Sequence, residues 1–274
     1  MAISNAALEA KCRLALRQAQ LFARPDAAVD ANGYVADWRL NLLPGISAQW
    51  VEPDFRQGSG NELGGKFRAA HSSSALVANV FAPFKQDPQG LRLPGAGRID
   101  GFCFERKCPT GLRGTPPNLD LVAMGPDGVV AIESKCLEPF AEKAAKFSDA
   151  YLSLPTVRKD SGWFRELMRL RAEPKAYAHL DAAQLIKHAF GLWRTWPDQP
   201  TTLLYLYWEP IDSGDHPFFR SHAKEAAMFG RRIAGAGPAF RAMPYSALLA
   251  LWDVPEAPRW LVEHLRQVRR RYCL

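Results

Sequence analysis

The chain has 274 residues, of which 47% are hydrophobic and 23% charged, and its formal net charge is +7. These proportions are typical of a globular protein and exclude collagen-like, fibrous and wholly disordered chains. The longest strongly apolar run, at residues 202–208, is far shorter than the roughly 20 residues of a membrane helix, and no secretory signal opens the sequence. We therefore expect a cytoplasmic protein whose positive charge favours a polyanionic partner.

The five cysteines are scattered along the sequence, at positions 12, 103, 108, 136 and 273. An odd and irregularly spaced set argues against a disulfide framework. Cys103 and Cys108 are followed by no second Cys or His pair at zinc-finger spacing. We expect thiols in a reducing compartment.

The predicted elements in the first third of the chain are helical. A helix over residues 5–23 ends before a proline and is followed by an irregular segment up to residue 60. Apolar residues at helical spacing predict a second helical segment over 62–84, within which the serines at 72–74 would cap a better-formed second piece.

The middle of the chain has strand patterns and then mixed elements. Strands are expected at 99–107, 118–124 and 129–136, and the last two flank a turn at 125–128. Helices are expected at 140–153 and 181–193, the latter with Asp181 as its N-cap and Gln184 in the capping-box position. A buried strand at 201–208 and helices near 220–234, 245–252 and 256–271 complete the prediction.

This order predicts an α/β fold with a mixed central β-sheet flanked by helices. We expect a single domain over residues 1–274 that has three parts. They are an N-terminal helix with an irregular segment (1–60), a core (61–210) and a C-terminal helical extension (211–274). The arginines near the C-terminus suggest that this extension contacts DNA or a second subunit.

The hairpin at residues 118–136 carries the residues with the clearest chemistry. Side chains alternate along a strand, so Glu133 and Lys135 share one face while Ser134 points to the other. If the turn is symmetric, Asp120 lies opposite Glu133 and Asn118 lies opposite Lys135, with Cβ atoms of opposed residues about 4.5–5.5 Å apart.

Two opposed carboxylates between apolar strands repel each other, and a divalent cation would remove that repulsion. Carboxylate oxygens suit Mg²⁺ or Mn²⁺. A bound metal ion lowers the pKa of a water molecule and neutralises charge on a phosphate, and Lys135 can position that water or stabilise the transition state. The set predicts phosphodiester hydrolysis, and the alternative interpretation is an exposed ion-pair cluster of little consequence.

The segment Asn118-Leu119-Asp120, followed after twelve residues by Glu133-Ser134-Lys135, resembles the motif of the PD-(D/E)xK superfamily of restriction-endonuclease-like nucleases. The expected order of helix, three strands, helix and strand is similar to the core of that family over roughly residues 60–210. Residues 71–81 also resemble those of bacterial restriction endonucleases. The chain departs from the motif in having Asn118 and Leu119 where the motif has a proline.

The resemblance implies a nuclease that depends on Mg²⁺, with Mn²⁺ as a substitute, and that cleaves double-stranded DNA. It implies that Asp120, Glu133 and the main-chain carbonyl of Ser134 are metal ligands and that Lys135 is the lysine of the motif. Glu62 corresponds to a glutamate that many members add from the preceding helix, with a helix-start acid as the alternative interpretation.

Two further residues are weighed as accessory to the site. His71 could contact a phosphate or could be a capping or surface histidine, and Gln184 could face the site or DNA or could belong to an ordinary polar helix face. Cutting of both DNA strands would favour a homodimer with two-fold symmetry.

Three functions remain open. The first is a DNA endonuclease in restriction, defence or repair, which the intact set Asp120, Glu133 and Lys135 favours. The second is a protein of the same fold that has lost catalysis and binds nucleic acid or a protein partner. The third is a basic structural or interaction protein whose hairpin carboxylates are exposed and widely separated.

Overall fold

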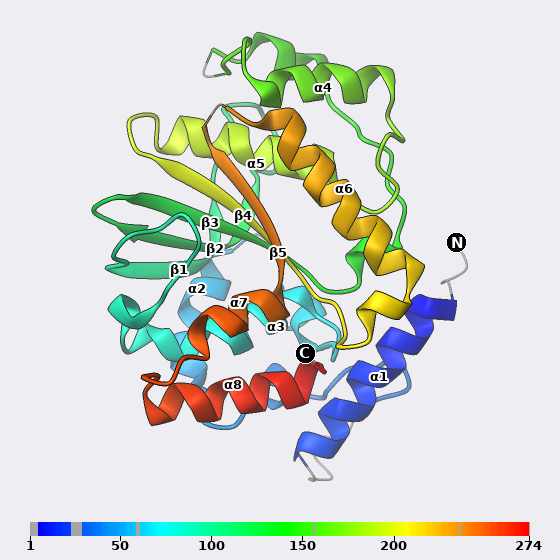
Figure 1. Ribbon diagram of the computed structural model, residues 1–274, viewed down its shortest axis with the longest axis vertical. Coiled ribbons are helices and arrows are strands. Elements are labelled where there is room, and N and C mark those ends of the chain that lie inside the picture. The colour runs from blue at the N-terminus through cyan, green and yellow to red at the C-terminus, as the bar shows by residue number, and fades with distance from the viewer. Residues whose placement is uncertain (1–4, 23–28, 59–60, 156, 236, 274) are drawn as a thin grey trace.

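A mixed β-sheet of five strands forms the centre of the molecule, in the order β1-β2-β3-β4-β5 (Figure 1). The computed structural model describes residues 5–22, 29–58, 61–155, 157–235 and 237–273. Strands β1 (Gly101–Lys107), β2 (Asn118–Gly125) and β3 (Gly128–Lys135) are antiparallel neighbours, whereas β4 (Thr201–Tyr207) and β5 (Ala239–Pro244) run parallel to β3.

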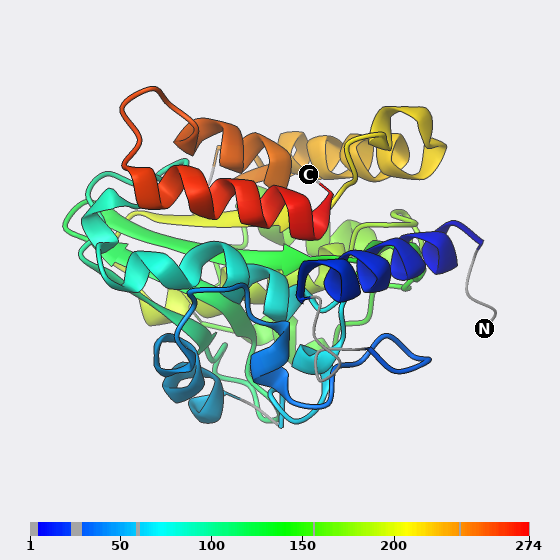
Figure 2. The same ribbon diagram turned by 90° about the horizontal axis from the view of Figure 1, so that it is seen from below.

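Helices cover both faces of this sheet (Figures 1 and 2). On one face, here called the α3 side, lie α1 (Asn5–Phe22), α2 (Glu52–Gln57), α3 (Ser73–Phe81), α7 (Tyr245–Trp252) and α8 (Arg259–Tyr272). On the other face, the α5 side, lie α4 (Gly162–Ala172), α5 (Ala182–Thr195) and α6 (Pro217–Ile233). The predicted α/β fold with a mixed sheet flanked by helices is confirmed.

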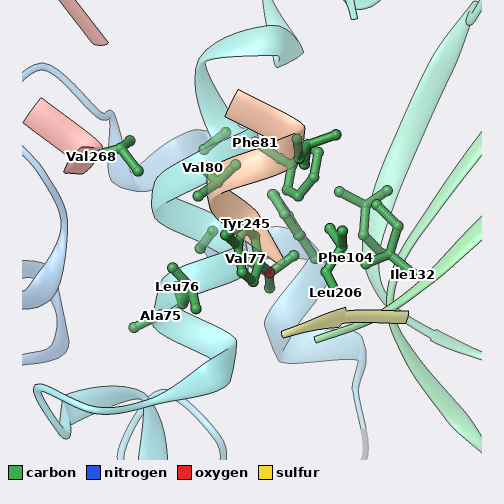
Figure 3. Packing of buried hydrophobic residues seen from close by; sticks show 14 of the residues in the cluster. Ala75, Leu76, Val77, Val80, Phe81, Phe104, Ile132, Leu206, Tyr245 and Val268 are labelled. Carbon is green, nitrogen blue, oxygen red and sulfur yellow. The ribbon is translucent and has the colours of Figure 1, made fainter. Parts of the chain in front are cut away.

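The alternation of side chains along β3 builds two hydrophobic cores. Val130 and Ile132 belong to the cluster on the α3 side, while Val129 and Ala131 belong to the cluster on the α5 side. Figure 3 shows the first core, in which α3 lies between the sheet and α8; the labelled residues are Ala75, Leu76, Val77, Val80, Phe81, Phe104, Ile132, Leu206, Tyr245 and Val268. The strands that carry the motif are therefore packed on both faces, which limits their movement.

The helical segment expected over 62–84 is only partly helical. A 3₁₀ turn covers Lys66–Arg68, and α3 begins at Ser73. Two consecutive glycines at positions 64 and 65 disfavour a continuous helix because glycine loses more backbone entropy than other residues when it becomes helical. Ser72 caps α3 by accepting a hydrogen bond from the N–H of Ala75 at 3.1 Å, as the serine cluster predicted.

The prediction of a helix over residues 140–153 is wrong. That stretch contains only 3₁₀ turns at Glu138–Phe140 and Asp149–Ser153. Ala145 donates its N–H to the carbonyl of Pro174, so a tertiary contact replaces the helical bond that its composition favours. Helices α2 and α4 and strand β5 were not predicted.

The C-terminal part of the chain joins the same cores, because β5 extends the sheet and α8 packs against α1 (Figure 2). Arg271 on α8 is fully buried and donates to the carbonyls of Leu14 and Ala70 and to Oδ1 of Asn41, at 2.8–3.2 Å. This arginine is therefore not part of a surface for DNA. The division of the chain at residues 60 and 210 stays a prediction.

Two properties of the described chain bear on the expectations from composition. Within the described ranges, no helix combines the length and the apolar character needed to cross a membrane. All five cysteines are free thiols, and Cys108 and Cys136 are buried.

Candidate active site

The β2–β3 hairpin has the register expected for a symmetric turn. Its pairs run from Gly125 with Gly128 to Leu121 with Ile132, where the ladder ends. Asp120 is the next residue at this open end, and its Oδ2 accepts a hydrogen bond from the main-chain N–H of Ser134 at 2.6 Å. The expected pairs Asp120–Glu133 and Asn118–Lys135 both lie beyond the ladder, and Asn118 pairs with Lys107 of β1 instead.

Glu133 and Lys135 form a buried ion pair at the end of β3. The Glu133 side chain is 2% exposed and that of Lys135 is 11% exposed, and Lys135 Nζ contacts Glu133 Oε1. The third function considered above required exposed carboxylates, and this burial does not fit it. Burying two charges is costly unless they pair with each other and find further hydrogen-bond partners.

Helix α5 supplies those further partners. Gln184 Oε1 accepts a hydrogen bond from Lys135 Nζ at 2.9 Å, and His188 Nε2 lies 2.9 Å from Glu133 Oε2. Gln184 and His188 are one turn apart and share a helix face. Asp181 caps the helix by accepting from the N–H of Gln184 at 3.0 Å, as predicted. The structure thus brings Gln184 to the motif, and His188 is a neighbour that sequence reasoning missed.

The two acids of the motif, Asp120 and Glu133, differ in how readily they ionise. Burial, followed by the charges of Glu133 and Glu105, raises the pKa of Asp120 well above its usual value. Burial also opposes ionisation of Glu133, but Lys135 and His188 outweigh it and lower the pKa of Glu133 to about 2. Burial by itself would lower the pKa of Lys135, but the charge of Glu133 outweighs burial, so this pKa is raised. The surroundings thus favour the charged forms of Glu133 and Lys135 and disfavour the charged form of Asp120.

Glu105 is a further acid of the site that the sequence did not reveal. The pairing of β1 with β2 skips this residue, whose φ of +53° is rare for a residue other than glycine. Its side chain contacts the amide nitrogen of Asn118. Burial and the charges of Glu62 and Glu133 raise the pKa of Glu105 to about 7, although the Asn118 contact lowers it. The sequence offered one sign of its role: Glu105 is an acidic residue that interrupts the aromatic pattern of the strand expected at 99–107.

The other two candidate residues differ in their surroundings. Glu62 lies in a turn before α3, and its Oε1 accepts from Ser74 Oγ at 2.7 Å. It is close enough to Glu105 to raise the pKa of that residue, so it belongs to the acidic surroundings of the motif. His71 lies edge-to-face against Tyr34, and among the described residues it makes no hydrogen bond or ion pair with the carboxylates of the motif.

The donor set suits a hard divalent cation. Glu133 disfavours the charge of Asp120, and Glu133 Oε2 is a buried oxygen with no aligned hydrogen-bond donor among the described residues. A cation would relieve both conditions. No group of three or more Asp, Glu, His or Cys side chains is arranged as metal ligands in the described part of the chain, so water, main-chain oxygen or phosphate would complete the coordination.

A protein-family profile with the description Restriction Endonuclease associating with ARP matches residues 16–273. That range includes every acidic residue of the site, Lys135 and all five strands. No curated protein and no solved structure matched the chain.

Proposed function

The chain belongs to the family Restriction Endonuclease associating with ARP, and on this premise we propose that it is a metal-dependent endonuclease of the PD-(D/E)xK type that hydrolyses double-stranded DNA. The observation that carries the proposal is the buried Glu133–Lys135 pair beside Asp120 at the open end of a rigid hairpin. Buried charges in such a setting are typical of functional sites.

Asp120, Glu133 and the main-chain carbonyl of Ser134 are the residues that would hold Mg²⁺ or Mn²⁺. The metal ion supplies a water molecule of lowered pKa and neutralises charge on the phosphate. Asp120 has one oxygen fixed by the N–H of Ser134, which leaves its Oδ1 as the ligand. Burial and Glu133 disfavour the charge of this carboxyl group, and a bound cation would offset that cost.

Lys135 would supply a hydrogen-bond donor to the reacting groups. An ammonium group has three N–H donors, and Glu133 and Gln184 accept two of them. The third donor is available to the attacking water or to a non-bridging phosphate oxygen, where it would stabilise the charge that develops during hydrolysis. The contacts with Glu133 and Gln184 fix the direction of this donor before the substrate arrives.

The flank of the site formed by β1 suits the DNA backbone. Arg106 and Lys107 are exposed directly after Glu105 and line a groove of about 220 Å³ with Asp54 and Gln57. Basic side chains beside a carboxylate site attract the phosphate backbone independently of sequence. Blunt cutting of both strands would favour two catalytic centres, so we propose a homodimer on DNA, which size-exclusion chromatography with a short duplex would test.

The test is cleavage of supercoiled plasmid by the full chain in Mg²⁺, Mn²⁺ or chelator. Asp120→Asn and Lys135→Ala should each lose at least about 10²-fold in rate. Asp198→Asn and Lys224→Ala, which change exposed residues of the same types, should cut like the parent. If the parent cuts and both site variants cut equally well, the assignment is wrong. A parent that binds DNA but cleaves none with any metal would instead be a binding protein of this fold.

A further inference from the structure

His188 is a buried polar side chain that the motif does not explain. Its side chain is 2% exposed, as is that of Glu133. It lies on a face of α5 whose neighbours Leu185, Ala189 and Leu192 belong to the hydrophobic core. A polar ring in such a place costs free energy unless it has a partner, and among the described residues the charged group within ion-pair distance of it is Glu133.

The contacts of Glu133 divide its two oxygens between two cationic or polar groups. Lys135 Nζ contacts Oε1, and His188 Nε2 lies 2.9 Å from Oε2. The His188 N–H is not aligned with this oxygen, so the contact is electrostatic in the described conformation. His188 Nδ1 has no hydrogen-bond partner within the described part of the chain. Glu133 is therefore the polar group with which this ring interacts.

We propose that His188 is a positioning residue for Glu133 that orients the carboxylate toward the cation; this rests on the metal-dependent function proposed above. A carboxylate offers about four lone-pair sites. With one site on each oxygen directed to Lys135 or His188, each oxygen keeps a second site for a metal ion. A glutamate held at both oxygens cannot rotate away, so the ligand is preorganised.

Helix α5 thereby aligns both charged residues of the Glu-Ser-Lys segment. Gln184 fixes Lys135, and His188, one turn later, fixes Glu133. The helix is itself fixed by the Asp181 cap and by the core on the α5 side. A small rotation of α5 would therefore disturb metal binding and the lysine together.

The experiment measures Mn²⁺ affinity of the full-length protein by calorimetry, without DNA, and does not depend on cleavage. In His188→Gln the amide nitrogen can take the place of Nε2 beside Glu133 Oε2, whereas His188→Leu fills the space without a polar group. We expect the Leu variant to bind Mn²⁺ about 10–100-fold more weakly, as for other residues that orient metal ligands, and the Gln variant to bind within a few-fold of the parent. A merely structural role for the ring would not give this rescue.

A matched control is His264→Leu, which changes another buried histidine, one whose Nε2 lies 3.0 Å from the carbonyl of Val80. It should lower Tm without changing Mn²⁺ affinity. If His188→Leu does not fold, His188→Asn replaces it. Its shorter amide cannot reach Glu133, so it should bind Mn²⁺ weakly while the Gln variant binds well.

The outcomes separate this inference from the function on which it rests. If Asp120→Asn loses Mn²⁺ affinity but His188→Leu keeps it, the inference alone is overturned. Loss of cleavage in His188→Leu with parental Mn²⁺ affinity overturns it as well. A parent that binds no Mn²⁺ overturns both the inference and the metal dependence.

Discussion

The main-chain N–H of Ser134 donates to Asp120 Oδ2 at 2.6 Å, at the point where β2 and β3 stop pairing. The Ser134 side chain points to the α3 side, where its Oγ lies 2.7 Å from the hydroxyl of Tyr245 and 3.3 Å from the carbonyl of Ser73. One residue thus connects the Asp120 carboxyl group to α3 and α7. At this end the β2–β3 ladder gives way to side-chain contacts, while β1 still pairs with β2 and β4 still pairs with β3.

Replacing Asp120 by Asn should stabilise the protein in chelator while abolishing cleavage. The charge of Asp120 is disfavoured by burial and by Glu133, and asparagine removes that charge while its Oδ1 can still accept from Ser134. A gain of about 1 kcal/mol would raise Tm by roughly 2 °C for a chain of this size. Thermal unfolding in EDTA at pH 8 measures it, and a Tm below that of the parent would contradict the prediction.

Addition of Mg²⁺ or Mn²⁺ should raise the Tm of the parent. A ligand that binds only the folded state at 100 times its Kd adds about 2.7 kcal/mol of stability. The increase should vanish in Asp120→Asn and persist in Asp198→Asn, in which the changed residue is exposed. An equal increase in both variants would mean that the ion binds elsewhere.

Stability in chelator should depend on pH through Glu105. Its pKa in the folded protein is about 7, against an ordinary value of 4.5, so the folded state favours the protonated form. This contribution is complete below pH 4.5 and is lost as the pH rises through 7, by roughly 3 kcal/mol in total. Glu105→Gln should therefore become more stable than the parent between pH 5 and pH 8. Urea unfolding at both values measures the difference, which must grow with pH.

His222 should limit stability in acid. Burial, followed by the charge of His179, lowers the pKa of His222 to about 4 from 6.5, and its Nε2 lies 2.9 Å from the hydroxyl of Tyr205. The folded state favours the neutral ring, so stability is complete above pH 6.5 and is lost as the pH falls through 4, by roughly 3 kcal/mol. His222→Gln should lose less stability than the parent between pH 7 and pH 4. His216→Gln, a change of a more exposed histidine, should match the parent.

The parts of the site that could be predicted are those fixed by local geometry. The Gly-Pro-Asp-Gly turn sets the hairpin register, and strand alternation places Glu133 and Lys135 on one face. Asp181 capped α5 because its side chain can accept from the first turn of the helix. Each inference needed only residues that are close in sequence.

The parts that could not be predicted depend on long-range packing or on unusual backbone geometry. Glu105 enters the site because its φ of +53° breaks the alternation of β1. His188 enters the site because the hydrophobic core beneath α5 sets the rotation of that helix about its own axis. Glu62 was expected on a helix, but the glycines after it prevent one. Strand β5 was missed because a short edge strand gains its stability from β4 and α6.

The burial of Arg271 has a practical consequence for shortened forms of the protein. Its guanidinium is the donor for acceptors on α1, on the turn at Asn41 and at Ala70, close to the start of α3. A truncation of only four residues from the C-terminal end would leave these oxygens inside the molecule with their donor removed, at a cost of about 1–3 kcal/mol for each one. A deletion far from the acids in sequence would thus loosen the helix that Ser134 contacts, and trimming the last turn would disturb the candidate site without removing any of its residues.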